Sequence, residues 1–113
     1  MPVSLVTQTE IALIWDFDRT LTTGYMQEPL FEHYGVNEKQ FWDEVNALCG
    51  FYDGHGLKLA DDTAYLGHTL NYVKNGRFAG LTNSLLRELG ARVGLAPGMP
   101  EFMQRTKDFI AAN

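Results

Sequence analysis

A single apolar run near the start of the chain limits what this sequence can fold into. Residues Ile11 to Phe17 are almost continuously apolar and rich in strand-forming side chains, without the alternation of a one-sided strand. Such a run is typical of a strand buried on both faces, as in a parallel α/β sheet. The rest of the chain offers only Ala91 to Leu95 as a weak second strand. Because a buried strand needs partners for its backbone groups, we expect this chain to be a fragment, or one half of an assembly.

Beyond this run, the apolar spacing predicts five helices, so that the chain as a whole should be mostly α-helical. Gly35 is a plausible stop for the first helix, and Asn37 with Gln40 resembles a capping box that opens the second. The third and fourth helices are expected over 61–75 and 82–90, and Pro100 suits the first turn of the fifth. The residues expected on the apolar stripes are Met26, Leu30, Phe31 and Tyr34; Phe41, Trp42, Val45, Leu48 and Cys49; Tyr65, Leu66, Thr69, Leu70 and Val73; Leu85, Leu86 and Leu89; and Phe102, Met103, Thr106, Phe109 and Ile110.

Charge and cysteine content restrict the class of protein. The 113 residues carry a formal net charge of -5, which disfavours binding to the phosphate backbone of nucleic acids. A single cysteine, Cys49, cannot build an intrachain disulfide framework, and the apolar run is far shorter than the ~18 residues of a membrane span. A signal peptide begins with a positively charged region, but no Lys or Arg precedes Arg19, so we expect no signal peptide. We therefore expect a cytoplasmic globular protein that binds neither nucleic acid nor membrane.

Two carboxylates follow the predicted strand directly. Asp16 and Asp18 are two positions apart, so an extended backbone would present both on the same side at the strand's carboxyl end, where α/β sheets bind ligands. Adjacent carboxylates repel unless a cation neutralises them, and oxygen ligands suit Mg²⁺. A calcium-binding EF-hand is excluded, because its sixth and twelfth positions would be Leu21 and Gln27 rather than Gly and Glu, and because a strand precedes it.

The apolar strand followed by Asp16-Phe17-Asp18-Arg19-Thr20 resembles the first motif of the haloacid dehalogenase (HAD) superfamily of phosphohydrolases. The resemblance implies that Asp16 is the nucleophile, forming a phosphoaspartyl intermediate, and that Asp18 is the general acid and then the general base. It places Mg²⁺ between the Asp16 carboxylate and the Asp18 backbone carbonyl, and it gives Thr20 the task of bracing the loop. Many relatives have Gly where Arg19 stands, so the role of Arg19 is unassigned.

The resemblance extends along the chain and divides it into three parts. Residues 1–24 would hold the first strand and catalytic loop of an α/β HAD-like (Rossmannoid) core, residues 25–93 a helical type-one cap, and residues 94–113 the return to the core with the start of a core helix. The Pro-Gly pair at 97–98 is similar to the family's re-entry point. Three later family elements are missing: a phosphate-binding Ser or Thr, a Lys, and an acidic pair that completes the metal site.

These features predict the N-terminal portion of a Mg²⁺-dependent phosphatase acting on a small phosphorylated substrate, inactive as an isolated chain. The alternative is a non-catalytic helical interaction module that retains the Asp-x-Asp motif. The unpaired strand could also support self-association. The motif is shared by phosphatases, dehalogenases and transferases, so it does not specify the substrate.

Other candidate groups form weaker patterns. His33, His55, His68 and Cys49 lack the spacing of a zinc site, and half-buried or polar helix positions explain them better. The Gly-rich stretch 53–56 does not lie between a strand and a helix N-terminus, as a phosphate-binding loop would. It fits a plain turn or a loop of the cap above the substrate.

Overall fold

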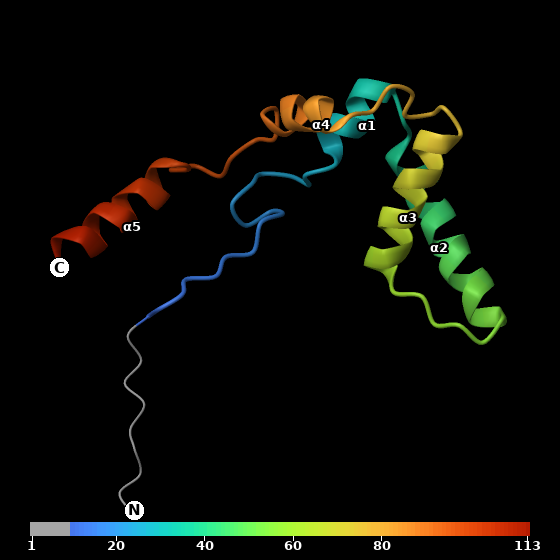
Figure 1. Ribbon diagram of the computed structural model, residues 1–113, viewed down its shortest axis with the longest axis horizontal. Coiled ribbons are helices and arrows are strands. Elements are labelled where there is room, and N and C mark those ends of the chain that lie inside the picture. The colour runs from blue at the N-terminus through green and yellow to red at the C-terminus, as the bar shows by residue number, and fades with distance from the viewer. Residues whose placement is uncertain (1–9) are drawn as a thin grey trace, which may run out of the picture.

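The computed structural model describes residues 10–113, and the regular secondary-structure elements in this range are all helices (Figure 1). Residues 1–9, which belong to the predicted 1–24 segment, lie outside the described residues. Within 10–113 the β-structure is limited to one isolated antiparallel bridge between Thr22 and Leu95. The helices are α1 (Glu28–Tyr34), α2 (Glu38–Gly54), α3 (Asp61–Lys74), α4 (Asn83–Gly90) and α5 (Glu101–Ala112).

Local capping explains where these helices begin and end. Asn37 Oδ1 accepts a hydrogen bond from the Gln40 backbone N–H at 2.9 Å and caps α2, as predicted. The reciprocal half of the capping box is wrong, because the Gln40 side chain donates to Glu44 at 3.0 Å instead. Thr82 caps α4 in the same way as Asn37 caps α2, and Gly35 ends α1 in the left-handed conformation with a φ of 63°.

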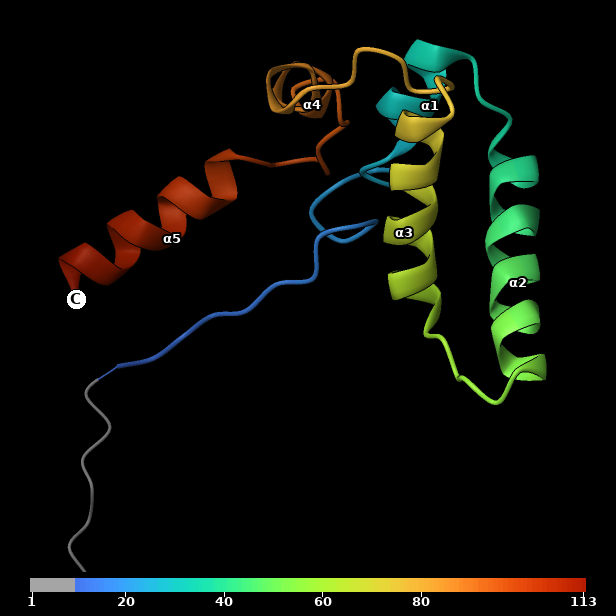
Figure 2. The same ribbon diagram turned by 45° about the vertical axis from the view of Figure 1, so that its right-hand side comes forward.

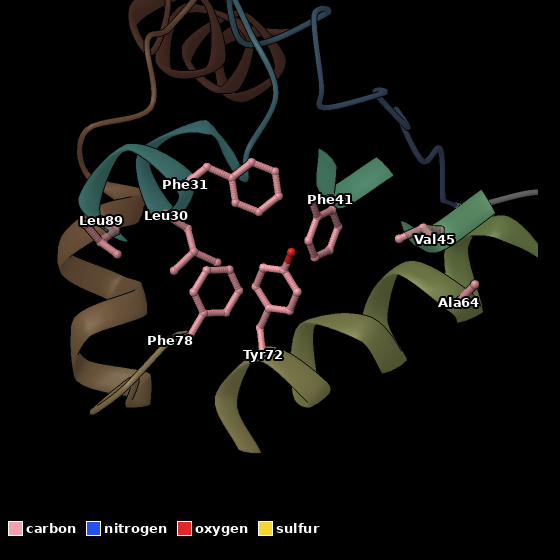
Figure 3. Packing of buried hydrophobic residues seen from close by; sticks show 8 residues of the cluster. All are labelled: Leu30, Phe31, Phe41, Val45, Ala64, Tyr72, Phe78 and Leu89. Atoms are coloured by element: carbon pink, nitrogen blue, oxygen red, sulfur yellow. The ribbon is translucent and has the colours of Figure 1, made fainter. Parts of the chain in front are cut away.

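The buried core lies between α1, α2, α3, α4 and the loop that precedes α4 (Figure 3). Helix α2 packs along α3, and α1 packs against α4. Aromatic rings fill the centre: Phe41 and Phe78 are fully buried, and Phe41 lies 4.9 Å from Phe31 and 5.1 Å from Tyr72 between ring centroids. The hydrophobic members of the core are Leu30, Phe31, Phe41, Val45, Ala64, Tyr72, Phe78 and Leu89.

The predicted buried stripe of α3 is partly wrong. Leu66 and Leu70 are 59% and 62% exposed, whereas Ala64 and Tyr72 are buried. Positions 64 and 72 lie about two helical turns apart on one face. Leu66 and Leu70 each lie two positions from one of them and therefore point to the opposite side. The aromatic core beside Tyr72 therefore fixes a rotation of α3 that exposes the two leucines.

The predicted strand over Ile11 to Phe17 is not formed. This segment has no regular secondary structure and makes no strand ladder, and Ile11 and Ile14 are 91% and 92% exposed. The physical reason is that a strand forms only when a neighbouring strand takes its backbone hydrogen bonds, and the sequence offers no convincing second strand. The chain is mostly helical as expected, but residues 10–113 contain no core strand.

Helix α5 stands apart from α1–α4 in both ribbon views (Figures 1 and 2). Phe109 and Ile110 on its predicted apolar stripe are 69% and 62% exposed. Its aromatic contact to the N-terminal segment is an edge-to-face pair between Trp15 and Phe102, with centroids 5.4 Å apart. The radius of gyration is 20.2 Å, against about 13 Å for a compact domain of this length. The helices α1–α4 thus form the packed unit. Two segments with exposed apolar residues, Ile11–Phe17 and α5, lie outside it and are called the apolar arms.

Candidate functional site

The Asp-x-Asp motif is followed by a tight turn. The carbonyl of Phe17 accepts hydrogen bonds from the backbone N–H groups of Thr20, Leu21 and Thr22, at 3.0 to 3.3 Å. Arg19 takes the left-handed conformation with a φ of 56°, which a glycine would adopt more easily. The Thr22 side chain is buried beneath the turn, and its hydroxyl lies 2.7 Å from the Gly24 carbonyl oxygen.

The three predicted site residues are held by different partners on this turn. The Thr20 hydroxyl donates to Asp16 Oδ2 at 2.9 Å, which links the first carboxylate to the turn that follows it. Asp18 Oδ1 accepts from the Met26 backbone N–H at 2.9 Å, so the second carboxylate faces the chain that enters α1. Asp16 and Thr20 are exposed, whereas Asp18 is half-buried. The turn therefore directs Asp18 toward the helices and leaves Asp16 accessible.

The chain leaves and re-enters this site at one place. Thr23 N–H donates to the Gly94 carbonyl, and Ala96 N–H donates to the Leu21 carbonyl, each at 2.9 Å. A Cβ atom on Gly94 would collide with the Thr23 hydroxyl, so a larger residue there would require the Thr23 side chain to rotate. This neck, formed by the segments before α1 and after α4, connects helices α1–α4 to the motif.

A cavity of about 780 Å³ lies between the motif turn and the N-terminal ends of α2 and α3. The motif contributes Asp18, α2 contributes its first turns, and α3 contributes its first turns. Asp16 is not among the residues that line it. The lining residues are Asp18, Tyr25, Met26, Gln27, Glu38, Lys39, Trp42, Asp61, Asp62 and Tyr65.

Aromatic rings and negative charge characterise this cavity. The rings of Trp42 and Tyr65 stack with centroids 5.3 Å apart and an interplanar angle of 25°. Burial raises the pKa of Tyr65, and the nearby negative charge of Asp18 raises it further. Tyr25 also lines the cavity, and the Arg19 guanidinium carbon lies 5.6 Å from its ring centroid. A hydrogen bond to Tyr25 raises the already high pKa of Arg19, so Arg19 carries a full positive charge.

Sequence reasoning missed most of the cavity residues. The sequence predicts Trp42 as part of the helical core, and it predicts the acidic pair Asp61-Asp62 only as the start of a helix. The signal that could have found them is that both helices place an aromatic residue immediately after a core residue, Phe41-Trp42 on α2 and Ala64-Tyr65 on α3. Packing between the helices decides which of their faces meet, and the residue spacing within each helix cannot predict that contact.

A second polar cluster links α2 to α3 through Glu44. This carboxylate lies 2.6 Å from His68 Nε2 and accepts from the Tyr72 hydroxyl at 2.7 Å, while Arg77 donates to Tyr72 at 2.8 Å. Partial burial by itself would raise the pKa of Glu44, but its hydrogen bonds to His68, Tyr72 and Gln40 outweigh burial and lower it. The cluster joins two helices within the packed unit, and we regard it as structural.

Metal ligation within the described residues is incomplete. Across residues 10–113 there is no group of three or more His, Cys, Asp or Glu side chains placed to hold a metal ion. Asp16 and Asp18 supply oxygen donors of the kind that Mg²⁺ prefers, and these would fill part of its octahedral shell. Further ligands would have to come from water, from substrate or from groups beyond this set.

Comparison with known proteins gives one relative to report. The chain is 42% identical over 90 residues to an uncharacterized protein from Borreliella burgdorferi, with 79% of this chain and 32% of that protein aligned. The chain thus spans about a third of the length of the relative that it matches. No protein-family model matches the chain, and no solved structure matches it. In the part of the chain that the structure describes, no helix combines the length and apolarity needed to cross a bilayer.

Proposed function

We propose that this chain is the N-terminal portion of a HAD-like, Mg²⁺-dependent phosphatase that acts on a small phosphorylated substrate in the cytoplasm. The observation that carries the proposal is the placement of the motif. Asp16 is accessible and tied to Thr20, and Asp18 lines the cavity at the neck of the helical insert. In this proposal residues 25–93 form the cap, and the core is completed by polypeptide outside residues 10–113.

The proposed reaction has two displacements at phosphorus. Asp16 Oδ1 attacks the phosphorus atom, the ester P–O bond breaks, and Asp18 protonates the departing alkoxide. Water then attacks the aspartyl phosphate, Asp18 accepts its proton, and inorganic phosphate leaves with Asp16 regenerated. The hydrogen bond from Thr20 engages Oδ2 and orients the carboxylate, so that Oδ1 would make the attack on phosphorus. Bound Mg²⁺ would neutralise charge on the transferring phosphoryl group.

The described residues contain too few groups to perform this reaction alone. Positioning and charge stabilisation supply most of the rate in phosphoryl transfer, and two carboxylates with one hydroxyl provide little of either for a dianionic phosphate. A longer relative is consistent with a larger catalytic unit, since 32% of that protein aligns with this chain. We therefore expect the isolated 113-residue chain to be inactive.

The second candidate is a non-catalytic helical interaction module. It is favoured by the fact that α1–α4 build their own core, while the apolar arms at Ile11–Phe17 and on α5 stay exposed. Exposed apolar segments of this size are typical of surfaces that bind another protein, including a second copy of the chain. Under this reading the aspartates would be dispensable for the protein's role.

The experiment compares phosphate release by two proteins made from the complete gene, including any in-frame sequence beyond Asn113. One carries Asp16→Asn, and the matched control carries Asp53→Asn, an exposed aspartate at the end of α2. We expect the Asp16→Asn protein to lose at least about 10³-fold in Mg²⁺-dependent turnover of a generic phosphate ester. The control should retain activity. Equal activity of both variants, or no activity in the unmodified protein, would favour the interaction module.

A further inference from the structure

We propose that the buried hydroxyl group of Thr22 positions the Asp18 carboxylate, because it ties the motif turn to the segment that enters α1. The consequence for catalysis rests on the proposed function, whereas the link itself does not. Thr22 is 2% exposed, although Asp16 and Thr20 on the same turn are exposed. Burial of a hydroxyl group is unfavourable unless hydrogen bonds replace those to water, so the partners of Thr22 indicate what its side chain does.

Thr22 Oγ1 lies within hydrogen-bond distance of three backbone groups. It accepts from the Arg19 N–H at 3.0 Å, and it lies 2.7 Å from the Gly24 carbonyl oxygen and 3.1 Å from the Phe17 carbonyl oxygen. A hydroxyl group has a single proton, and the shorter distance assigns it to Gly24. The Phe17 carbonyl accepts three other N–H groups of the turn in any case. The Thr22 hydroxyl therefore bridges Arg19 and Gly24.

This bridge joins the two segments that hold Asp18. Arg19 follows Asp18 directly in the chain. Met26 comes two residues after Gly24, and its backbone N–H donates to Asp18 Oδ1 at 2.9 Å. The Arg19 N–H also contacts the Gly24 carbonyl directly, but at the longer distance of 3.2 Å. Loss of the hydroxyl group would therefore loosen Gly24 from the motif turn and let the Met26 N–H move away from Asp18.

The backbone of Thr22 is held independently of its side chain. Thr22 pairs with Leu95 in the antiparallel bridge, and two backbone hydrogen bonds of 2.9 Å flank this pair in the neck. None of these contacts uses the hydroxyl group. A substitution at position 22 is therefore expected to leave the neck and helices α1–α4 in place, so that its effect reports on the link to Asp18.

Under the proposed function the link affects one of the two carboxylates that react. The Asp16 carboxylate is bonded to Thr20. Asp18 must lie beside the departing oxygen to give it a proton, and a displacement of a catalytic group by about 1 Å can cost about 10²-fold in rate. A leaving group that is stable as an anion needs no proton from Asp18. The loss should therefore be large for an alkyl phosphate and small for a nitrophenyl phosphate.

The link is tested first in the 113-residue chain, by amide hydrogen exchange measured with NMR. Thr22→Val removes the hydroxyl group at nearly constant size, Thr22→Ser retains it, and Thr23→Val is the matched control at an exposed position. We expect the Met26 amide to exchange at least about fivefold faster in Thr22→Val and at an unchanged rate in the other two variants. The amide of Val45, on the buried face of α2, should be unaffected in all three.

An unchanged exchange rate of the Met26 amide in Thr22→Val would overturn the link. Faster exchange at Val45 would show instead that this variant has disturbed the fold. Thr22→Ala then takes its place, because it also lacks the hydroxyl group but puts no additional methyl group beside the backbone carbonyls, and the same two amides decide the outcome.

The second test measures ester cleavage by the complete gene product with Mg²⁺. Glycerol 2-phosphate is compared with p-nitrophenyl phosphate through kcat/KM, which covers binding and the first displacement. For Thr22→Val we expect a loss of about 10²-fold on the glycerol ester and of no more than about threefold on the nitrophenyl ester. Thr22→Ser should restore most of the activity, and Thr23→Val should match the unmodified protein. Equal losses on the two esters, or a Thr22→Ser protein as impaired as Thr22→Val, would overturn the positioning role.

Failure of this inference can be told apart from failure of the proposed function. If the complete gene product has no Asp16-dependent phosphatase activity, the proposed function fails, and exchange at the Met26 amide still decides whether Thr22 holds Asp18 in place. Phosphatase activity with unchanged exchange at Met26 in Thr22→Val would retain the proposed function and refute the link.

Discussion

Phe41→Ala tests whether the helices around the aromatic core are one packed unit. Phe41 is fully buried. The centroid of its ring lies 4.9 to 6.1 Å from the ring centroids of Phe31, Trp42, Tyr65, His68 and Tyr72. Truncation of a buried Phe to Ala costs about 3–5 kcal/mol, and aromatic pairs add about 0.5–1.5 kcal/mol each without being additive. We therefore expect a loss at the upper end, about 4–5 kcal/mol.

That loss is large beside the total stability of a unit this small. Small domains have about 5–15 kcal/mol of unfolding free energy, so the variant should lose from about a third to nearly all of its stability. Urea titration followed by circular dichroism at the helical band measures the change in unfolding free energy. Phe51→Ala is the matched control, because Phe51 lies on the same helix and is 59% exposed. It should change stability by no more than about 0.5 kcal/mol. Similar losses for the two variants would refute the packing described for α2.

Three further predictions follow from the structure. Trp42→Ala should lower the free energy of unfolding by about 2 kcal/mol, less than the ~3–5 kcal/mol of a fully buried tryptophan, because Trp42 is only half-buried at the cavity wall. Thermal unfolding measures this loss, and a change typical of a surface residue would contradict the stacked pair with Tyr65. Glu44→Gln should lower the free energy of unfolding by about 1–2 kcal/mol at pH 7, because the charged carboxylate makes the stabilising contacts. This difference from the unmodified chain should shrink as the pH falls below about 4.5 through the lowered pKa of Glu44. A pH-independent difference would contradict this, and Glu32→Gln is the control. The isolated chain should release no phosphate from a generic ester even with millimolar Mg²⁺, and Asp16-dependent turnover would show that its described groups suffice.

Local signals in the sequence predicted the helices well. Asn37 and Thr82 cap α2 and α4 through contacts three residues away, and Gly35 ends α1 through its own backbone conformation. Each of these effects is complete within one helical turn, so the sequence alone contains it.

The features that sequence reasoning missed depend on distant partners. Leu66 and Leu70 are exposed because the aromatic core beside Tyr72 fixes the rotation of α3. The segment from Ile11 to Phe17 forms no strand because residues 10–113 offer it no neighbouring strand. At the site, the motif predicts Asp16, Asp18 and Thr20 as site residues, and of these Asp18 lines the cavity; the motif does not predict the cavity itself, which lies where the ends of α2 and α3 meet the motif turn.

The most direct test of the proposed mechanism is to trap the covalent intermediate. The complete gene product is mixed with a phosphate ester and Mg²⁺, quenched in acid, and reduced with borohydride, which converts an aspartyl phosphate to homoserine. Peptide mass spectrometry then locates the modified residue. We predict homoserine at position 16, dependent on substrate and absent from the Asp16→Asn protein. Steady turnover with an unmodified Asp16, or with the modification at another residue, would contradict the assignment of Asp16 as the nucleophile.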